Sequence, residues 1–291
     1  ILKEWTAEIR VEPGAILRVR QVLRAGLVGR LFHQRTAHRQ GPLRRPRQAL
    51  RPRRLHPVRL RGLAQRANRR RRSEFNTKWR RGMAEKRSAA KEIHFVVSET
   101  AGVVSGLLLK PEHSVSLLVF AHGAGAGMRH RFIEDLSQRL AELGVATMRY
   151  QFPYMEKRVK RPDSEGVLIA TVQAALTAAE KYSDGVPIFA GGKSMGGRMT
   201  SLALAKAPHD KVQGLIFFGF PLHAPGAPSA ERGKHLVDVQ VPMLFIQGSR
   251  DALADLKLLK PLCAELDGRA ELFVVDGGDH SLHMLKRSGR T

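Results

Sequence analysis

The chain has 291 residues, enough for one large domain or two small ones, and carries a formal net charge of +24 at pH 7. Its single cysteine, Cys263, excludes an internal disulfide and a metal site built from several cysteines. The apolar runs are shorter than a membrane span and no signal-peptide pattern is found, so we expect a cytoplasmic protein without a membrane partner.

The positive charge is concentrated at the start of the chain. Residues 1–82 contain 24 Lys and Arg against 4 Asp and Glu, whereas residues 83–291 contain 26 against 22. Arginine runs such as residues 69–72 repel one another and cannot bury an apolar face. We therefore expect residues 1–82 to form a largely disordered, Arg-rich leader, with room for a short helix at residues 16–31.

Three interpretations of this leader are open. It could bind nucleic acid through phosphate contacts, it could be an organelle-targeting segment, or it could be upstream sequence that is not part of the working protein. We favour the third, because Met83 begins a domain of ordinary composition and an excess of Arg over Lys is typical of spurious translation of GC-rich sequence. A nucleic-acid partner is then expected only if the leader exists in the mature protein.

From Met83 onward, predicted strands alternate with predicted helices. The strands are expected at residues 93–99, 102–110, 116–121, 146–151, 187–190, 214–219, 243–247 and 271–275. The helices are expected at residues 131–143, 164–182, 195–207, 252–266 and 281–287, with Pro261 kinking or splitting the fourth. This alternation predicts one α/β domain over residues 83–291, a doubly wound, mainly parallel sheet with helices on both faces. The first two strands have a short connection and should pair antiparallel at one edge.

One of these strands leads into a motif that carries chemistry. The strand at 187–190 is followed by Gly-Gly-Lys-Ser-Met-Gly at 191–196 and then by a helix. Gly192, Ser194 and Gly196 form the G-x-S-x-G pattern, in which small residues let the chain turn sharply and expose the serine at the top of a sheet. The pattern predicts that Ser194 is a nucleophile.

A serine nucleophile needs a base and an orienting carboxylate, which follow it along the chain in the order Asp, His on such a sheet. Asp251 comes just after the strand at 243–247, and His280 follows the strand at 271–275. Asp251 could instead cap the next helix. The weaker alternatives are Asp255 and Asp276 for the acid and His283 for the base.

The reaction also needs donors for the oxyanion. The backbone N–H of Met195 is one, and we assign the second to Ala124, with Gly125 next, in the glycine-rich loop after the strand at 116–121. Side chains and loops that could line the substrate pocket are His122, Gly123, Gly125, Tyr150, Tyr154 and His223. For His122 the favoured role is to orient its loop, while His223 and the tyrosines could equally be loop or packing residues.

Several other motifs are discounted. Neighbouring residues on a tight turn point in different directions, so Lys193 is not expected to be the base, and Arg198 should pair with a carboxylate. A P-loop would need glycine at Pro187, and a dinucleotide fingerprint would need glycine at Met128. We therefore expect no cofactor and no metal.

Residues 83–291 resemble the α/β-hydrolase superfamily, and within it a small dienelactone-hydrolase-like group that includes the hydrolase-like subunit of a histone acetyltransferase complex. The motifs that carry the resemblance lie at residues 122–125, 149–155, 192–198, 220–223, 248–251 and 279–280. The resemblance implies the α/β-hydrolase fold, a Ser194/Asp251/His280 triad and hydrolysis of an ester or acyl compound.

Two functions from different classes follow. The first is a serine hydrolase acting on a small or medium ester, thioester or related acyl substrate, because the domain leaves little sequence for a large lid. The second is a non-catalytic scaffold in a protein assembly. The oligomeric state and the natural substrate are left open by the sequence.

Overall fold

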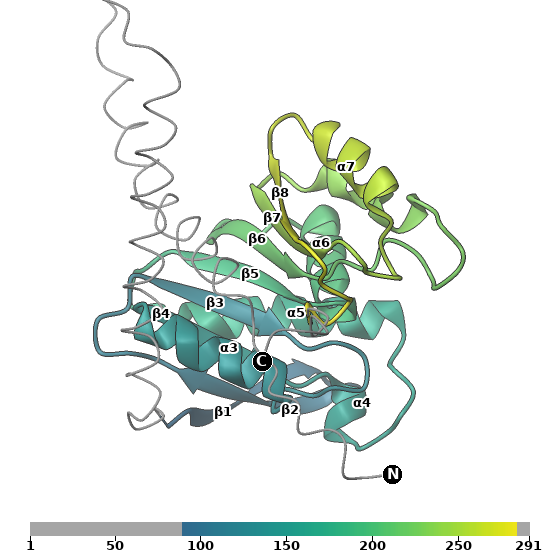
Figure 1. Ribbon diagram of the computed structural model, residues 1–291. Helices are drawn as coiled ribbons and strands as arrows, with labels where there is room; N and C mark the ends of the chain where they lie inside the picture. Colours follow the sequence, from purple (N-terminus) through teal and green to yellow (C-terminus); the bar gives the residue numbers. More distant parts are fainter. Residues whose placement is uncertain (1–88, 284–291) are drawn as a thin grey trace, which may run out of the picture. The chain divides into compact units, whose positions relative to one another are not determined.

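The computed structural model describes residues 89–283, so the predictions for residues 1–82 lie outside the described residues. One eight-stranded sheet runs through this region in the order β1-β2-β4-β3-β5-β6-β7-β8 (Figure 1). The strands are β1 (Lys91–Ser98), β2 (Gly102–Leu109), β3 (Ser116–Ala121), β4 (Val145–Tyr150), β5 (Ile188–Lys193), β6 (Val212–Phe218), β7 (Met243–Gly248) and β8 (Ala270–Val275).

The pairing of the strands confirms the predicted architecture. β1 pairs with β2, and β2 with β4, in antiparallel fashion, whereas all pairs from β4 to β8 are parallel. Every residue of β3 and of β7 is buried, as expected for continuous apolar strands covered on both faces. Since parallel strands point the same way, the loops after β3, β5, β7 and β8 emerge at one edge of the sheet.

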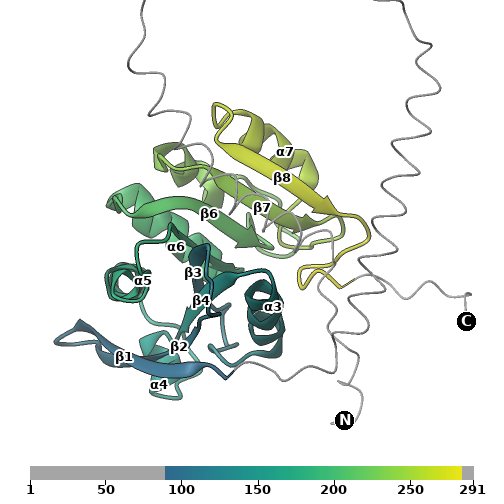
Figure 2. The same ribbon diagram turned by 90° about the vertical axis from the view of Figure 1, so that its left-hand side faces the viewer.

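Helices cover both faces of the sheet. They are α3 (Arg131–Glu142), α4 (Pro153–Glu156), α5 (Glu165–Glu180), α6 (Met195–Lys206), the 3₁₀-helix η2 (Glu231–Asp238) and α7 (Leu256–Ala264). Figure 2 shows α3 on one side of the strands and α5 with α6 on the other. In α5, the buried residues Leu168, Val172 and Leu176 recur every four positions, so one apolar stripe faces the sheet. Within residues 89–283, no helix is both long enough and apolar enough to span a bilayer.

Two predicted helices differ from the observed ones. The helix expected at 252–266 begins only at Leu256, because the Asp255 carboxylate accepts the Lys257 N–H and caps it there. Pro261 does not split α7, which continues through it to Ala264. The N–H that proline lacks would have bonded to the carbonyl of Lys257, and Lys257 is exposed, so water can take the place of that donor. Residues 281–283 are not helical, and the rest of the helix expected at 281–287 lies outside the described residues.

Candidate active site

Ser194 occupies a strained turn between β5 and α6. Its φ of 52° and ψ of −121° are rarely adopted by a residue with a side chain. The neighbouring glycines are required by close approach, because a Cβ on either Gly192 or Gly196 would lie 2.6 Å from the Ala121 carbonyl oxygen. The end of β3 therefore presses against the turn and holds Ser194 at the tip of β5.

The side chains of Ser194, His280 and Asp251 form a chain of hydrogen bonds. The His280 Nε2 lies 2.8 Å from the Ser194 Oγ, and the His280 Nδ1 lies 2.8 Å from the Asp251 Oδ2. Because a carboxylate faces Nδ1, the proton of a neutral imidazole belongs there, which leaves Nε2 to accept from the serine hydroxyl. The Asp251 side chain is fully buried, whereas 26% of the His280 side chain is exposed.

Asp251 is held by two further donors. Its Oδ2 accepts from the Gln247 Nε2 at 2.5 Å, and its Oδ1 accepts from the Leu253 N–H at 2.8 Å. The Gln247 amide is itself oriented, because its Oε1 accepts the Phe220 N–H at 2.9 Å. Such charge-assisted bonds offset the free energy of burying a carboxylate. Sequence reasoning missed Gln247, which lies four residues before Asp251 at the end of β7.

The alternative acids and base have other partners. Asp255 caps α7, so the interpretation of Asp251 as the cap of that helix is wrong. Asp276 accepts a hydrogen bond from the Ser249 Oγ at 3.3 Å. His283 lies 3.7 Å from Asp279. The structure thus brings Asp251 and His280 to Ser194 and directs their competitors elsewhere.

The loop after β3 lies against the serine turn. A Cβ on Gly123 would be 3.6 Å from the Ser194 Cβ, so Ala124 follows at the mouth of the site and is exposed. The Gly125 N–H donates to the Tyr154 Oη at 3.1 Å and is already satisfied. Among residues 89–283, the Ala124 N–H has no acceptor, and Met195 begins α6, where an N–H has no intrahelical acceptor. Within the described residues, both N–H groups are therefore free to donate, and that of Met195 directly follows Ser194.

The segment after β4 fixes this loop. The Met128 N–H donates to the Gln151 Oε1 at 2.8 Å, and the Met128 carbonyl accepts from the Arg149 Nη1 at 3.3 Å. With the Tyr154 bond to Gly125, three side chains from one segment hold the backbone of the loop. Such support keeps the donors in place before a substrate arrives. The roles of Gln151 and Arg149 could not be read from residue type, because they depend on β4 lying beside β3.

The two histidines predicted near the pocket hold backbone groups. The His122 Nδ1 lies 2.7 Å from the Gly123 carbonyl and its Nε2 accepts the Phe152 N–H, while burial lowers the pKa of His122 to about 4. The His223 Nδ1 lies 2.8 Å from the Ala224 carbonyl, and its Nε2 accepts the Asp255 N–H. Each Nε2 accepts a backbone N–H and each Nδ1 faces a carbonyl, so both rings hold their loops and have no nitrogen free for a substrate.

The two predicted pocket tyrosines are buried as well. Only 1% of each residue, Tyr150 and Tyr154, is exposed. The Tyr150 ring packs edge-on against Phe152, and burial raises the pKa of the Tyr150 hydroxyl. Tyr154 acts through its hydroxyl on Gly125. Ring packing accounts for the position of Tyr150, and the hydrogen bond to the loop gives Tyr154 a structural role.

The comparisons with known proteins agree with the fold. Residues 114–291 match the family model described as an alpha/beta hydrolase domain. The chain belongs to the α/β-hydrolase family. The fold of this α/β hydrolase is similar to that of a dienelactone hydrolase from Anabaena variabilis, with a TM-score of 0.56 and 19% identity over 68% of this chain and 90% of that one.

Two further proteins are similar to this α/β hydrolase, one in structure and one in sequence. An α/β serine hydrolase without lid from Xanthomonas campestris has a TM-score of 0.54 and 20% identity over 67% of this chain and 88% of that one. A putative phosphoribosyl transferase of Mycobacterium tuberculosis is 28% identical over 61% of this chain. The match spans only 39% of that protein, so its name describes a much longer chain.

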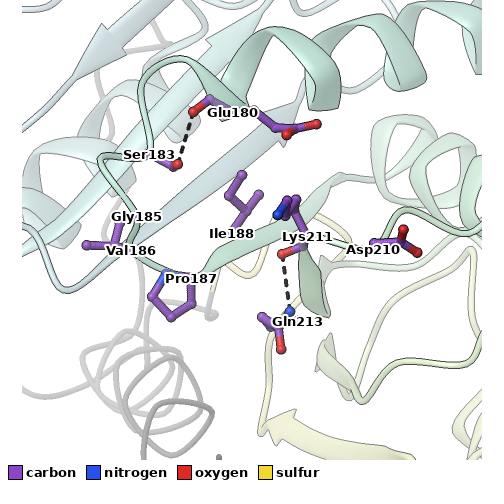
Figure 3. A pocket seen from close by; sticks show the side chains of 9 residues that line it. All are labelled: Glu180, Ser183, Gly185, Val186, Pro187, Ile188, Asp210, Lys211 and Gln213. Atoms are coloured by element: carbon purple, nitrogen blue, oxygen red, sulfur yellow. Dashed lines mark hydrogen bonds between the residues drawn. The ribbon is translucent and has the colours of Figure 1, made fainter.

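A cavity of 440 Å³ lies at the other edge of the α/β-hydrolase sheet. Figure 3 shows its lining, which includes Pro187 before β5 and Lys211 before β6. These residues precede their strands, whereas ligands of parallel sheets bind at the carboxyl ends. The cavity is therefore separate from Ser194. In residues 89–283, no group of three His, Cys, Asp or Glu side chains is arranged to hold a metal ion.

The two basic residues near Ser194, Lys193 and Arg198, both have partners in the structure. The Arg198 Nη2 lies 3.6 Å from the Glu165 Oε2, which confirms the predicted carboxylate partner. The Lys193 Nζ donates to the backbone carbonyl of His280. An ammonium engaged as a donor to a carbonyl cannot act as the base for Ser194.

Proposed function

We propose that this α/β hydrolase is a serine hydrolase that cleaves a small or medium ester, thioester or related acyl compound. The observation that carries the proposal is the hydrogen-bonded chain from Ser194 through His280 to the buried Asp251. We assign the oxyanion donors to the N–H groups of Met195 and Ala124, which have no acceptor within residues 89–283. This combination is typical of acyl transfer through a serine nucleophile.

The chemistry follows from the geometry. The Ser194 Oγ attacks the carbonyl carbon while its proton passes to the His280 Nε2, and the oxyanion is stabilised by the Met195 and Ala124 N–H groups. The imidazolium then gives this proton to the leaving alcohol or thiol, which departs and leaves an acyl-enzyme. Water, deprotonated by His280, attacks the acyl-enzyme carbonyl, and the imidazolium returns this proton to the Ser194 Oγ as the bond to the acyl group breaks, which releases the acid and free Ser194. Asp251 orients the ring and stabilises the imidazolium throughout.

The expected substrate is a compact molecule. Between β6 and β7, the described chain forms only the short η2 and its flanking loops, so within residues 89–283 no separate lid domain is inserted there.

We further propose a cytoplasmic location with the acyl substrate as the partner. A free buried thiol fits a reducing compartment, and burial raises the pKa of Cys263 to about 11.

The test uses the full chain and a series of p-nitrophenyl esters of increasing acyl length. We expect turnover that falls with chain length and labelling of Ser194 by a fluorophosphonate probe, located by peptide mass spectrometry. Ser194→Ala should lose both while keeping its thermal unfolding transition. The matched control is Ser114→Ala, a serine on the loop before β3. Equal turnover in Ser194→Ala, or no labelling of the folded wild type, would contradict the proposal, and the second result would favour a scaffold.

A further inference from the structure

Lys193 joins the serine turn to the histidine loop. It is the last residue of β5, directly before Ser194, and its Nζ donates to the His280 carbonyl oxygen at 2.5 Å. A Cβ built on Gly219 would lie 2.9 Å from this Nζ and 2.8 Å from the same oxygen. The ammonium, the carbonyl and the Gly219 backbone, which has a φ of 65°, are thus packed in direct contact.

Stability alone does not explain a cation in this place. Burial lowers the pKa of Lys193 to about 8, although the negative charges of Asp251 and Asp279 act in the other direction and raise it. Removing an ammonium from water is unfavourable, and an apolar side chain of similar length would avoid that penalty. The ammonium has two contacts that an apolar side chain would lack, the hydrogen bond to the His280 carbonyl and a position 5.9 Å from the centre of the Phe132 ring.

The histidine loop has a reason to need such a contact. It follows β8, the last strand of the sheet order and a strand that is mostly half-buried. Several of its hydrogen bonds are internal, such as those of the Ser281 and His283 N–H groups to the Asp279 Oδ1. Bonds within a loop shape it but do not fix its distance from β5. The Lys193 contact spans that distance.

We propose that Lys193 is a positioning residue, whose partly buried ammonium fixes the His280 backbone so that the imidazole stays within hydrogen-bond distance of the Ser194 hydroxyl. The inference rests on the proposed serine-hydrolase function. It assigns Lys193 no contact with the substrate. Because Lys193 and Ser194 are consecutive, the nucleophile and the base are tied together through a single side chain.

The first measurement separates kcat from KM. Lys193→Met keeps the length of the side chain and removes its donor, and we expect kcat to fall up to about 100-fold with KM nearly unchanged, since small misplacements of reacting groups have effects of this size. The unfolding temperature should change little, because the lost hydrogen bond to the His280 carbonyl is offset by the removal of a partly buried charge. Lys206→Met, the same substitution at an exposed lysine of α6, is the matched control. A kcat within twofold of the wild type would overturn the inference.

The second measurement does not depend on turnover. In proton NMR spectra, the hydrogen bond between the His280 Nδ1 and Asp251 should give a downfield imidazole resonance, assigned by its absence in His280→Gln. We expect Lys193→Met to broaden or lose this resonance and Lys206→Met to keep it. An unchanged resonance in Lys193→Met would overturn the positioning role, even if kcat falls. If wild-type Ser194 is not labelled by fluorophosphonate but the resonance depends on Lys193, the proposed function fails and the positioning role stands.

Discussion

The two halves of the candidate site are held in place by different means. On the nucleophile side, β3 and the β5 turn approach so closely that Gly192 and Gly196 have no room for a side chain. On the acid–base side, Asp251 and His280 are placed by side-chain hydrogen bonds from Gln247 and Lys193. A close backbone contact is disrupted when an added side chain overlaps the neighbouring strand. A hydrogen-bond network is disrupted when a substitution removes one of its donors. Substitutions should therefore damage the first half mainly through folding, and the second through activity, with a loss of stability added where a buried group loses its partner.

The largest effect is expected on the acid–base side. Asp251→Asn should reduce kcat by about 10³- to 10⁴-fold, because an amide does not hold the required tautomer or stabilise the imidazolium. The fold should survive, since the amide is isosteric with the carboxylate. Asp276→Asn is the control, because its partner is Ser249. Steady-state kinetics on a p-nitrophenyl ester decide the point, and comparable losses in both variants would show that the acid is misassigned.

A smaller effect, on stability, is expected on the nucleophile side. A Cβ on Gly196 would lie 2.5 Å from the His122 carbonyl oxygen, so Gly196→Ala should lower the free energy of unfolding by about 3 kcal/mol. The matched control is Gly166→Ala in α5, where a Cβ meets nothing within 4 Å. That variant should gain up to about 1 kcal/mol from helix propensity. Urea denaturation measures both, and equal stabilities would contradict the close-contact explanation.

Gln247 lies in the acid–base half, where its two hydrogen bonds should affect both stability and activity. Gln247→Ala leaves the buried Phe220 N–H without an acceptor and removes one donor from Asp251, so we expect a loss of about 2 kcal/mol in stability. The kcat should fall as well, because the carboxylate is less well oriented. Gln240→Ala is exposed and should change stability by less than about 0.5 kcal/mol. A stable Gln247→Ala with full activity would show that the network is dispensable.

The smallest effect depends on pH. His122 has a pKa of about 4 when folded, against an ordinary value of 6.5, so between these values the unfolded chain binds the proton more strongly. Stability should therefore fall by about 1 kcal/mol per pH unit as the pH is lowered through this range, and His122 should contribute no slope above it. Denaturation at several pH values measures the slope.

Two variants isolate the contribution of His122 to that slope. The pKa of His235 is also lowered to about 4, mainly by burial, so this residue adds its own share. The contribution of His122 is then the difference between the wild type and His122→Asn. His94→Asn, at a histidine with 58% of its side chain exposed, is the matched control for the substitution. An identical slope in all three proteins would contradict the assignment.

Local sequence was sufficient for much of the fold. All eight predicted strands are present, since continuous apolar runs such as 116–121 and 243–247 have few alternatives to a buried strand. The boundaries of α7 were harder to predict. Pro261 and the polar residues before Leu256 each suggest a break, and which residue caps the helix depends on how the loop packs.

The sequence by itself determined the nucleophile turn, because the G-x-S-x-G pattern between a strand and a helix can be read locally, although the close approach of β3 that requires Gly192 and Gly196 is a tertiary contact. It also indicated Asp251 and His280, because each directly follows a strand and such ends meet at one edge of a parallel sheet. Tertiary structure alone decided the partners of Lys193, Gln247 and Gln151, and the structural roles of His122 and His223. Each of these depends on which polar group another strand or loop presents to a buried side chain, and residue type does not encode that choice.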